Sequence, residues 1–390
     1  MYFLILLAAV LGLLCVFSLC VTFYNVWVNL NTWQKRIHIG RLTDIETWKS
    51  AITHTARKWI RRPPVVPKDD QHQWLLLDKL RGKYENSTIQ SWQVAGLLLG
   101  LDSSDTQLNS KDIDAIIKKY GSTKNVERAL LAYSLLMLAD RYPDYRKAAD
   151  NFAVETLNIL YDIKAEADTI PYRKQSPSVR YVDTLGFVCP FLIKYSNVIK
   201  KPELKSLAKL QLQEYRSRFH SELNLPPHAY NIDNNVPMGV YDWGRGIGWY
   251  ILALVESRRS LQTGRDGNQD LNTYLAELIL ELSENLIRFQ KDNGGYAMFV
   301  TDTNGQFEAS ATSLSGLLFL EAYTISKDSK YLKAVERILK SLMAVTQRNG
   351  AIDLCQGDTK GIALYSTHLG LMPFIQGITV SLANRYVSLT

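Results

Sequence analysis

No charged side chain occurs in residues 1–34, and residues 2–28 are almost continuously apolar. At helical rise, this run is long enough to cross a hydrocarbon core about 30 Å thick. We therefore predict a single transmembrane helix as the membrane anchor, with membrane lipid as its partner. A cleaved signal peptide is the alternative, but the segment lacks the basic start and the small-residue cleavage site of a signal peptide. Tyr24, Trp27 and Trp33 lie at the far end of the run, where aromatic rings favour the headgroup level.

Cysteine is scarce, with four residues in a chain of 390. Cys15 and Cys20 lie in the predicted membrane helix, while Cys189 and Cys355 lie in the main domain without the spacing of metal ligands. These positions exclude a disulfide framework and predict buried free thiols. The histidines also lack ligand spacing, so we expect no metal and no organic cofactor.

Excess positive charge is nearly absent from the main part of the chain. Residues 35–62 hold eight basic and two acidic side chains, so they account for +6 of the formal net charge of +7 and leave +1 for all that follows. A nearly neutral domain does not imply nucleic acid as a partner. The basic flank beside the uncharged run predicts a single-pass membrane protein with its domain on the cytoplasmic side.

The segment of residues 35–67 combines a basic helical pattern with a proline-rich stretch. Its apolar side chains recur at helical spacing, which fits either a helix lying on an anionic membrane surface or an ordinary domain helix with a solvated basic face. The prolines in residues 61–67 cannot continue a helix. We therefore predict an anchor over residues 1–34, a juxtamembrane helix and linker over 35–67, and the main domain over 68–390.

Strict alternation of apolar and polar residues is absent from the main domain, whereas helical periodicity recurs almost throughout. Short connections between helices of similar length indicate stacked helical hairpins. Because no 34-residue period is present, we favour an all-α, (α/α)6-type toroid over an open repeat solenoid. About eleven helices are predicted, over residues 88–99, 111–119, 126–141, 145–160, 184–199, 203–219, 246–261, 272–289, 310–325, 331–344 and 368–383.

Three clusters of glycine, aromatic and polar residues interrupt this pattern, at residues 181–192, 241–250 and 308–313. Such clusters suit a sugar site, because aromatic rings stack on pyranoses, arginine pairs with a uronate carboxylate, and a carboxyl group transfers protons. Each cluster also has a structural interpretation. Asp183 then caps a helix, Arg245 forms a structural ion pair, and the tryptophans belong to the core.

The clusters resemble segments of glycoside hydrolase families 88 and 105, the unsaturated glucuronyl and rhamnogalacturonyl hydrolases, over residues 126–383. Asp183 begins a predicted inner helix that runs into Pro-Phe-Leu, as the general acid/base of those families does. Residues 243–249 resemble the motif Trp-x-Arg-Gly-Asn-Gly-Trp, and residues 227–230 resemble the segment of the pocket histidine. The resemblance implies Asp183 as the catalytic residue and a substrate-binding set of His228, Trp243, Arg245 and Trp249.

The chain departs from the family pattern at several positions. Ile247 stands in place of the motif's Asn, Gly244 in place of its usual Ala, and Phe187 where many members have Met. A second acidic residue of the family has no clear counterpart, with only Asn125 and Glu127 nearby. These departures are compatible with an altered substrate or with a site that no longer catalyses.

The resemblance implies hydrolysis of oligosaccharides or polysaccharides that end in an unsaturated uronyl residue, through hydration of the vinyl ether. The alternative is a non-catalytic glycan-binding or assembly subunit of a membrane polysaccharide pathway. A third possibility is a conventional glycosidase or lyase with the same fold. Its carboxylate would be Asp242 or Glu308.

Overall fold

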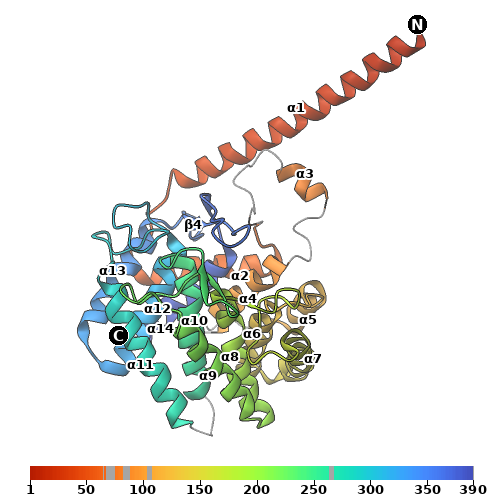
Figure 1. The fold of residues 1–390 in the computed structure, drawn as a ribbon. Helices are drawn as coiled ribbons and strands as arrows, with labels where there is room; N and C mark the ends of the chain where they lie inside the picture. Colours follow the sequence, from red (N-terminus) through yellow and green to blue (C-terminus); the bar gives the residue numbers. More distant parts are fainter. Residues whose placement is uncertain (65, 67–74, 82–87, 103–107, 263–267, 390) are drawn as a thin grey trace.

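The computed structural model describes residues 1–390 except residues 65, 67–74, 82–87, 103–107, 263–267 and 390. The described chain is mainly helical, with short strands near one end of the molecule (Figure 1). Its helices are α1 (Tyr2–Arg36), α2 (Ile45–Arg61), α3 (Leu75–Leu80), α4 (Thr88–Asp102), α5 (Ser110–Tyr120), α6 (Arg128–Arg141), η2 (Pro143–Tyr145), α7 (Arg146–Lys164), α8 (Val182–Ile199), α9 (Glu203–Arg216), α10 (Gly244–Gln262), α11 (Gln269–Ile287), α12 (Ala309–Ser326), α13 (Ser329–Ala344) and α14 (Pro373–Val387).

Six of the described helices form a closed inner ring in the order α4, α6, α8, α10, α12 and α14, with α14 packed back against α4. These helices are buried on nearly all sides, and every residue of α6 from Arg128 to Ala139 is buried. A helix that is apolar around most of its circumference belongs in the interior. The predicted closed toroid is therefore confirmed.

The outer layer consists of helices with one buried face. Within the described chain α5 packs on α4, α7 on α6, α9 on α8, α11 between α10 and α12, and α13 on α12. Helix α13 buries Tyr331, Ala334, Val335, Ile338 and Leu339, which recur at intervals of three and four residues. One-sided burial at this spacing is typical of an amphipathic helix that covers a core.

Helix α2 completes the outer layer, because it packs against both α14 and α4. Trp48, Ile52 and Ala56 have no exposed surface, and the indole Nε1 of Trp48 donates a hydrogen bond to Thr346 Oγ1 at 2.8 Å. The apolar face of α2 is therefore covered by protein and does not lie on a membrane. Of the two interpretations of this segment, the ordinary domain helix describes it, and the toroid begins at α2 rather than at residue 68.

The ring closes where α14 meets α4 at very short range. A Cβ atom on Gly377 would lie 1.9 Å from the carbonyl oxygen of Gly96. Only glycine at position 377 allows the two backbones to approach this closely.

Short strands join the inner helices at one end of the ring, although the sequence predicted none. β1 (Val179–Tyr181), β2 (Ala229–Asn231) and β3 (Val236–Met238) form one antiparallel sheet, and β4 (Cys355–Gln356) pairs with β5 (Leu369–Gly370). Segments of two or three residues are too short for alternation to be recognised. The last helix was predicted from residue 368, but β5 occupies that stretch and α14 begins at Pro373.

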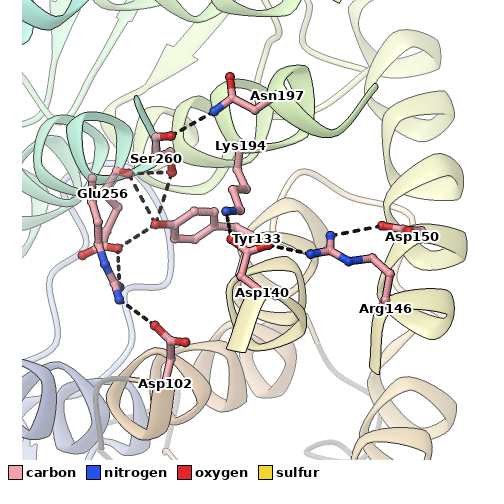
Figure 2. Close-up of polar contacts among 10 residues, drawn as sticks. Asp102, Tyr133, Asp140, Arg146, Asp150, Lys194, Asn197, Glu256 and Ser260 are labelled. Atoms are coloured by element: carbon pink, nitrogen blue, oxygen red, sulfur yellow. Dashed lines mark hydrogen bonds and ion pairs between the residues drawn. The ribbon is translucent and has the colours of Figure 1, made fainter. Parts of the chain in front are cut away.

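A buried polar network ties the inner helices together at the opposite end of the ring, where they finish (Figure 2). The carboxylate of Glu256 accepts hydrogen bonds from Tyr133 Oη at 2.7 Å, from Arg259 at 3.4 Å and from Arg385. Arg259 also donates to Asp102 at 2.6 Å. Burial alone would raise the pKa of Glu256, but the charges of Arg385 and Arg259 lower it to about 2. Neighbouring ion pairs join Lys194 to Asp140, Arg146 to Asp140 and Asp150, and Arg258 to Glu321. The side-chain amide of Asn197 donates a hydrogen bond to the carbonyl of Ser260.

Helix α1 projects away from the toroid as a long rod and contacts the short helix α3 (Figure 1). Its 35 residues include an 18-residue window with a mean hydropathy of 3.0, of which only 6% is buried. Helix α8 is also long and apolar enough to span a membrane, but 78% of it is buried, as expected for a core helix. The N-terminal helix thus has the length and composition of a membrane span or a signal sequence.

Candidate active site

The predicted site residues meet at the end of the ring where the inner helices begin. Asp183, His228, Trp243, Arg245 and Trp249 all line one cavity of about 310 Å³. Asp183 lies at the start of α8, and Trp243 and Arg245 lie at the start of α10. Because the inner helices start at the same end, residues far apart in sequence surround one space.

Asp183 and His228 are brought together by the register of the short sheet. β1 pairs with β2 so that Tyr181 lies opposite Ala229, and the amide of Val182 donates to the carbonyl of His228 at 3.0 Å. The next residue, Asp183, therefore faces the imidazole, with Oδ2 at 3.9 Å from Nε2. This distance is too long for a hydrogen bond.

The Asp183 carboxyl is held in a weakly solvated position. Its side chain is 15% exposed, and within the described chain Oδ2 is buried without a hydrogen-bond partner. Burial raises the pKa of Asp183 to about 7, against the lowering effects of Arg245 and of its own backbone amide. Asp183 is the second residue of α8, where Tyr181 is the N-cap, so the helix-capping interpretation does not describe it.

His228 is neutral and has a defined orientation. Burial and the charge of Arg245 lower its pKa to about 4. Its Nδ1 lies 3.2 Å from Tyr365 Oη, which also accepts a hydrogen bond from the Val240 amide at 3.1 Å. The phenol can donate its hydrogen to Nδ1 or accept one from it, and in either case the contact fixes the imidazole with Nε2 facing Asp183. Gly239 makes this contact possible, since a Cβ there would lie 2.8 Å from the phenol oxygen.

Trp243 and Arg245 hold the loop around β4 over the cavity. Trp243 Nε1 donates to Gln356 Oε1 at 2.9 Å, and Arg245 donates to the carbonyls of Gln356 at 2.6 Å and Gly357 at 2.7 Å. No carboxylate partner of Arg245 is found among the described residues, so a structural ion pair does not explain its burial. Its charge faces Asp183 instead, where it lowers the carboxyl pKa.

Trp249 forms an aromatic wall of the cavity. Its ring centroid lies 4.6 Å from Phe187, 4.8 Å from Phe374 and 5.3 Å from Trp92. The ring is 2% exposed, so it belongs to the core as well as to the cavity lining. Ile247 belongs to the hydrophobic core and does not line the cavity. The replacement of the motif's Asn therefore removes no polar group from the cavity wall.

Glu127 supplies a second carboxylate, although the sequence showed no clear counterpart of one. It is the N-cap residue of α6 and is 2% exposed. It accepts hydrogen bonds from Tyr172 Oη at 3.0 Å and from Arg173 at 2.6 and 3.2 Å. All three residues line the cavity beside Asp183. A paired carboxylate of this kind helps to shape the cavity.

Sequence reasoning missed most of the cavity rim. Arg173 lies in a loop whose aromatic and basic composition resembles the recognised clusters, and this was the available signal. Residues 358–361, which follow β4 in the chain, complete the lining. Asp242 and Glu308, the carboxylates of a conventional glycosidase or lyase with this fold, have structural roles instead. Glu308 caps α12 and accepts the Gln356 amide at 2.8 Å, whereas Asp242 accepts a hydrogen bond from Thr301, and neither lines the cavity.

The cavity has no evident metal centre. Among the residues that the structure describes, no group of three or more His, Cys, Asp or Glu side chains is placed to hold a metal ion. Cys189 and Cys355 are buried free thiols, as predicted.

Solved structures with the same fold are known from bacteria. A possible family 105 member from Salmonella enterica serovar Paratyphi A matches 89% of this chain and 94% of its own, with a TM-score of 0.69 and 17% identity. A possible family 105 member from Klebsiella pneumoniae matches the same shares with a TM-score of 0.70 and 16% identity. An unsaturated glucuronyl hydrolase from Bacillus sp. GL1 covers 85% of this chain and 94% of its own, with a TM-score of 0.61 and 14% identity.

The sequence itself carries a more specific relationship. Residues 110–367 match the model of Glycosyl Hydrolase Family 88. The matched region includes every charged residue found in the cavity wall, from Glu127 to Lys360. With two thirds of its length in this match and the toroid of these enzymes, the chain is a glycoside hydrolase that belongs to family 88.

Proposed function

We propose that this protein hydrolyses oligosaccharides with an unsaturated uronyl residue at their end, by hydration of the vinyl ether. The observation that carries this proposal is the Asp183 carboxyl, whose Oδ2 is buried without a hydrogen-bond partner among the described residues and whose pKa is raised to about 7. A carboxyl group with a pKa near the working pH both donates and accepts a proton efficiently. Hydration of a double bond needs one such group, whereas ordinary glycoside hydrolysis uses two.

The chemistry assigns two successive tasks to Asp183. In the first step the carboxyl proton adds to C4 of the C4=C5 double bond, which leaves positive charge shared between C5 and the ring oxygen. In the second step the carboxylate takes a proton from water as the water oxygen bonds to C5. The resulting hemiketal opens to a ketone at C5, which leaves C1 as an open-chain hemiacetal. Collapse of this hemiacetal to an aldehyde breaks the bond to the next sugar and releases its alcohol. The net change is the addition of one water molecule.

The surroundings of Asp183 support a uronate as the bound sugar. The first turns of the inner helices point their free amides toward the cavity end, which favours negative charge there. Arg245 adds a buried positive charge, while Trp243 and Trp249 contribute to the aromatic lining of the cavity. His228 Nε2 lies on the same side, 3.9 Å from Asp183 Oδ2, and offers the sugar a hydrogen-bonding group.

The alternative of a non-catalytic glycan-binding subunit was favoured by the membrane anchor and by Ile247. Its side chain lies in the core, so this departure leaves the polar groups of the cavity in place. The raised pKa of Asp183 has no structural benefit, because an ionised carboxylate in that position destabilises the fold. A carboxyl group that is retained despite this cost to stability favours an enzyme over a non-catalytic binding subunit.

The test is to incubate the purified full-length protein with a panel of lyase-generated unsaturated oligosaccharides and to follow the ultraviolet absorbance of the conjugated double bond. We expect the absorbance to fall while saturated saccharides of the same composition remain intact. Cleavage of the saturated saccharides at an equal rate would show that the double bond plays no part.

We also propose that α1 anchors the protein as a single-pass membrane helix, with the toroid on the cytoplasmic side. Support comes from the length and hydropathy of α1, its exposure, and the basic residues that follow it. The protein should remain with membranes after carbonate washing, and the toroid should resist protease added outside intact cells. Carbonate release would contradict the anchor, and digestion from outside would contradict the orientation.

A further inference from the structure

The end of α1 is fixed to the toroid by specific contacts. Arg36, its last residue, donates hydrogen bonds to both carboxylate oxygens of Asp353, at 2.7 and 2.8 Å, and to the carbonyl of Leu369 at 2.8 Å. The amide of Gly40 donates to the carbonyl of Thr346 at 2.9 Å. The Asp353 side chain is 1% exposed, and a bidentate pair with a buried carboxylate sets direction as well as distance. We call these contacts of residues 36–40 the anchor clamp.

The anchor clamp lies at the cavity end of the toroid. Leu369 belongs to β5, where it pairs with Gln356 of β4. Gln356 in turn accepts hydrogen bonds from Trp243 and Arg245 in the cavity wall. A short chain of contacts therefore connects the end of the apolar helix to the candidate active site. Figure 1 shows α1 leaving the toroid beside β4.

The spacing along α1 places the cavity end close to the lipid headgroups. Trp27 is half-exposed near the end of the apolar run, where aromatic rings favour the membrane interface. Nine residues separate it from Arg36, which corresponds to about 14 Å of helix. Once α1 crosses a bilayer, the clamp holds the cavity end within roughly that distance of the interface.

Among the residues that the structure describes, the other end of the ring offers the substrate no comparable entrance. Tyr133 and Ser260 have no exposed surface there, and Glu256 is 1% exposed. The network drawn in Figure 2 fills the space between α4, α6 and α10. A saccharide therefore reaches Asp183 from the end that carries the anchor clamp.

We propose that the anchor clamp turns the open end of the toroid toward the bilayer, and that the cavity takes the end of a saccharide tethered to the same membrane by a lipid. This inference rests on the proposed uronyl chemistry and on the membrane anchor. A saccharide that rises from the bilayer enters along the axis of the ring. A free chain must instead pass through the narrow space between toroid and headgroups.

The orientation is tested by energy transfer to an acceptor dye on lipid headgroups, with the full-length protein in vesicles. A donor dye is placed at Leu364→Cys near the cavity or at Lys201→Cys after α8, in a background with Cys15 and Cys20 replaced by Ser. Both positions are exposed. They differ by about the length of α8, roughly 27 Å, so transfer from position 364 should be at least about twofold greater. Equal or reversed transfer overturns the orientation.

The substrate class is tested with one unsaturated disaccharide in two forms, free in solution or coupled to phosphatidylethanolamine in the same vesicles. The matched control inserts a flexible Gly/Ser linker of about 15 residues between Gln34 and Lys35, which keeps the anchor in the membrane and separates it from the clamp, so that the toroid is no longer held against the bilayer. We expect the wild type to prefer the tethered form, and the control to gain at least about threefold in kcat/KM on the free form. No gain, or equal use of both forms by the wild type, overturns the proposed substrate. If neither form is consumed while the transfer difference stands, the uronyl chemistry fails and the orientation is supported.

Discussion

Replacing Asp183 by Asn should stabilise the protein at alkaline pH while it abolishes most of the activity. The folded-state pKa of Asp183 is about 7, compared with 3.8 for an ordinary aspartate. A pKa difference of about three units means that the folded state is less stable with the carboxyl ionised than with it protonated, by roughly 4 kcal/mol. Because the folded state binds this proton more tightly than the unfolded state does, the contribution to stability is fully present below about pH 4. It is lost as the pH rises through about 7.

Asn resembles the protonated carboxyl in shape and never ionises. The variant should therefore unfold at the same temperature as the wild type at pH 4. At pH 8 it should be more stable, by up to about 4 kcal/mol. Turnover should fall at least about a hundredfold at every pH, as is typical for loss of a general acid/base.

The assay compares thermal unfolding of the full-length proteins in detergent at both pH values, together with turnover of an unsaturated oligosaccharide. Asp242→Asn is the matched control, because Asp242 accepts a hydrogen bond from Thr301 and does not line the cavity. It should keep near-normal turnover. A stability difference that does not grow between pH 4 and pH 8 would refute the argument that the Asp183 carboxylate is desolvated.

Three further predictions concern the surroundings of Asp183 and the far end of the ring. In the wild type, kcat/KM should stay level from about pH 5 to pH 6 and then fall tenfold per unit above about pH 7, because His228 with its pKa of about 4 is already neutral. Tyr365→Phe removes the hydroxyl that hydrogen-bonds to His228 Nδ1 and fixes the imidazole, so kcat should fall about tenfold at pH 6 with little change in melting temperature, as measured by parallel kinetics and calorimetry. Glu256→Gln leaves Arg385 with a weakened partner and should lower stability by about 3 kcal/mol at pH 7 without changing KM; an unchanged melting temperature would contradict it.

The sequence was sufficient to predict the helices and the closed ring, because helical periodicity reports which face of each helix is buried. It was also sufficient to bring Asp183, Trp243 and Arg245 to one end of the ring, since each begins an inner helix. The resemblance to a known family added His228 and the direction of the chemistry. These features of the fold and the site could be predicted because each depends on a local sequence pattern or on a recognisable motif.

The remaining parts depended on long-range contacts that leave no local pattern. The apolar residues of α2 have the same spacing whether they contact lipid or α14, and only the folded chain distinguishes the two. Glu127 shows no sign in sequence of its pairing with Arg173, which follows 46 positions later. The clamp between Arg36 and Asp353 spans 317 positions and was likewise invisible.

The polar network that fills one end of the ring has a kinetic consequence. A site with a single opening is a pocket that is closed at its inner end. The terminal sugar therefore binds deepest, and the rest of the saccharide lies between it and solvent. After cleavage the shortened chain must leave first and the released uronyl product second. Product inhibition should reflect this order: the uronyl product should compete with substrate, whereas the shortened chain should inhibit noncompetitively by trapping the product behind it.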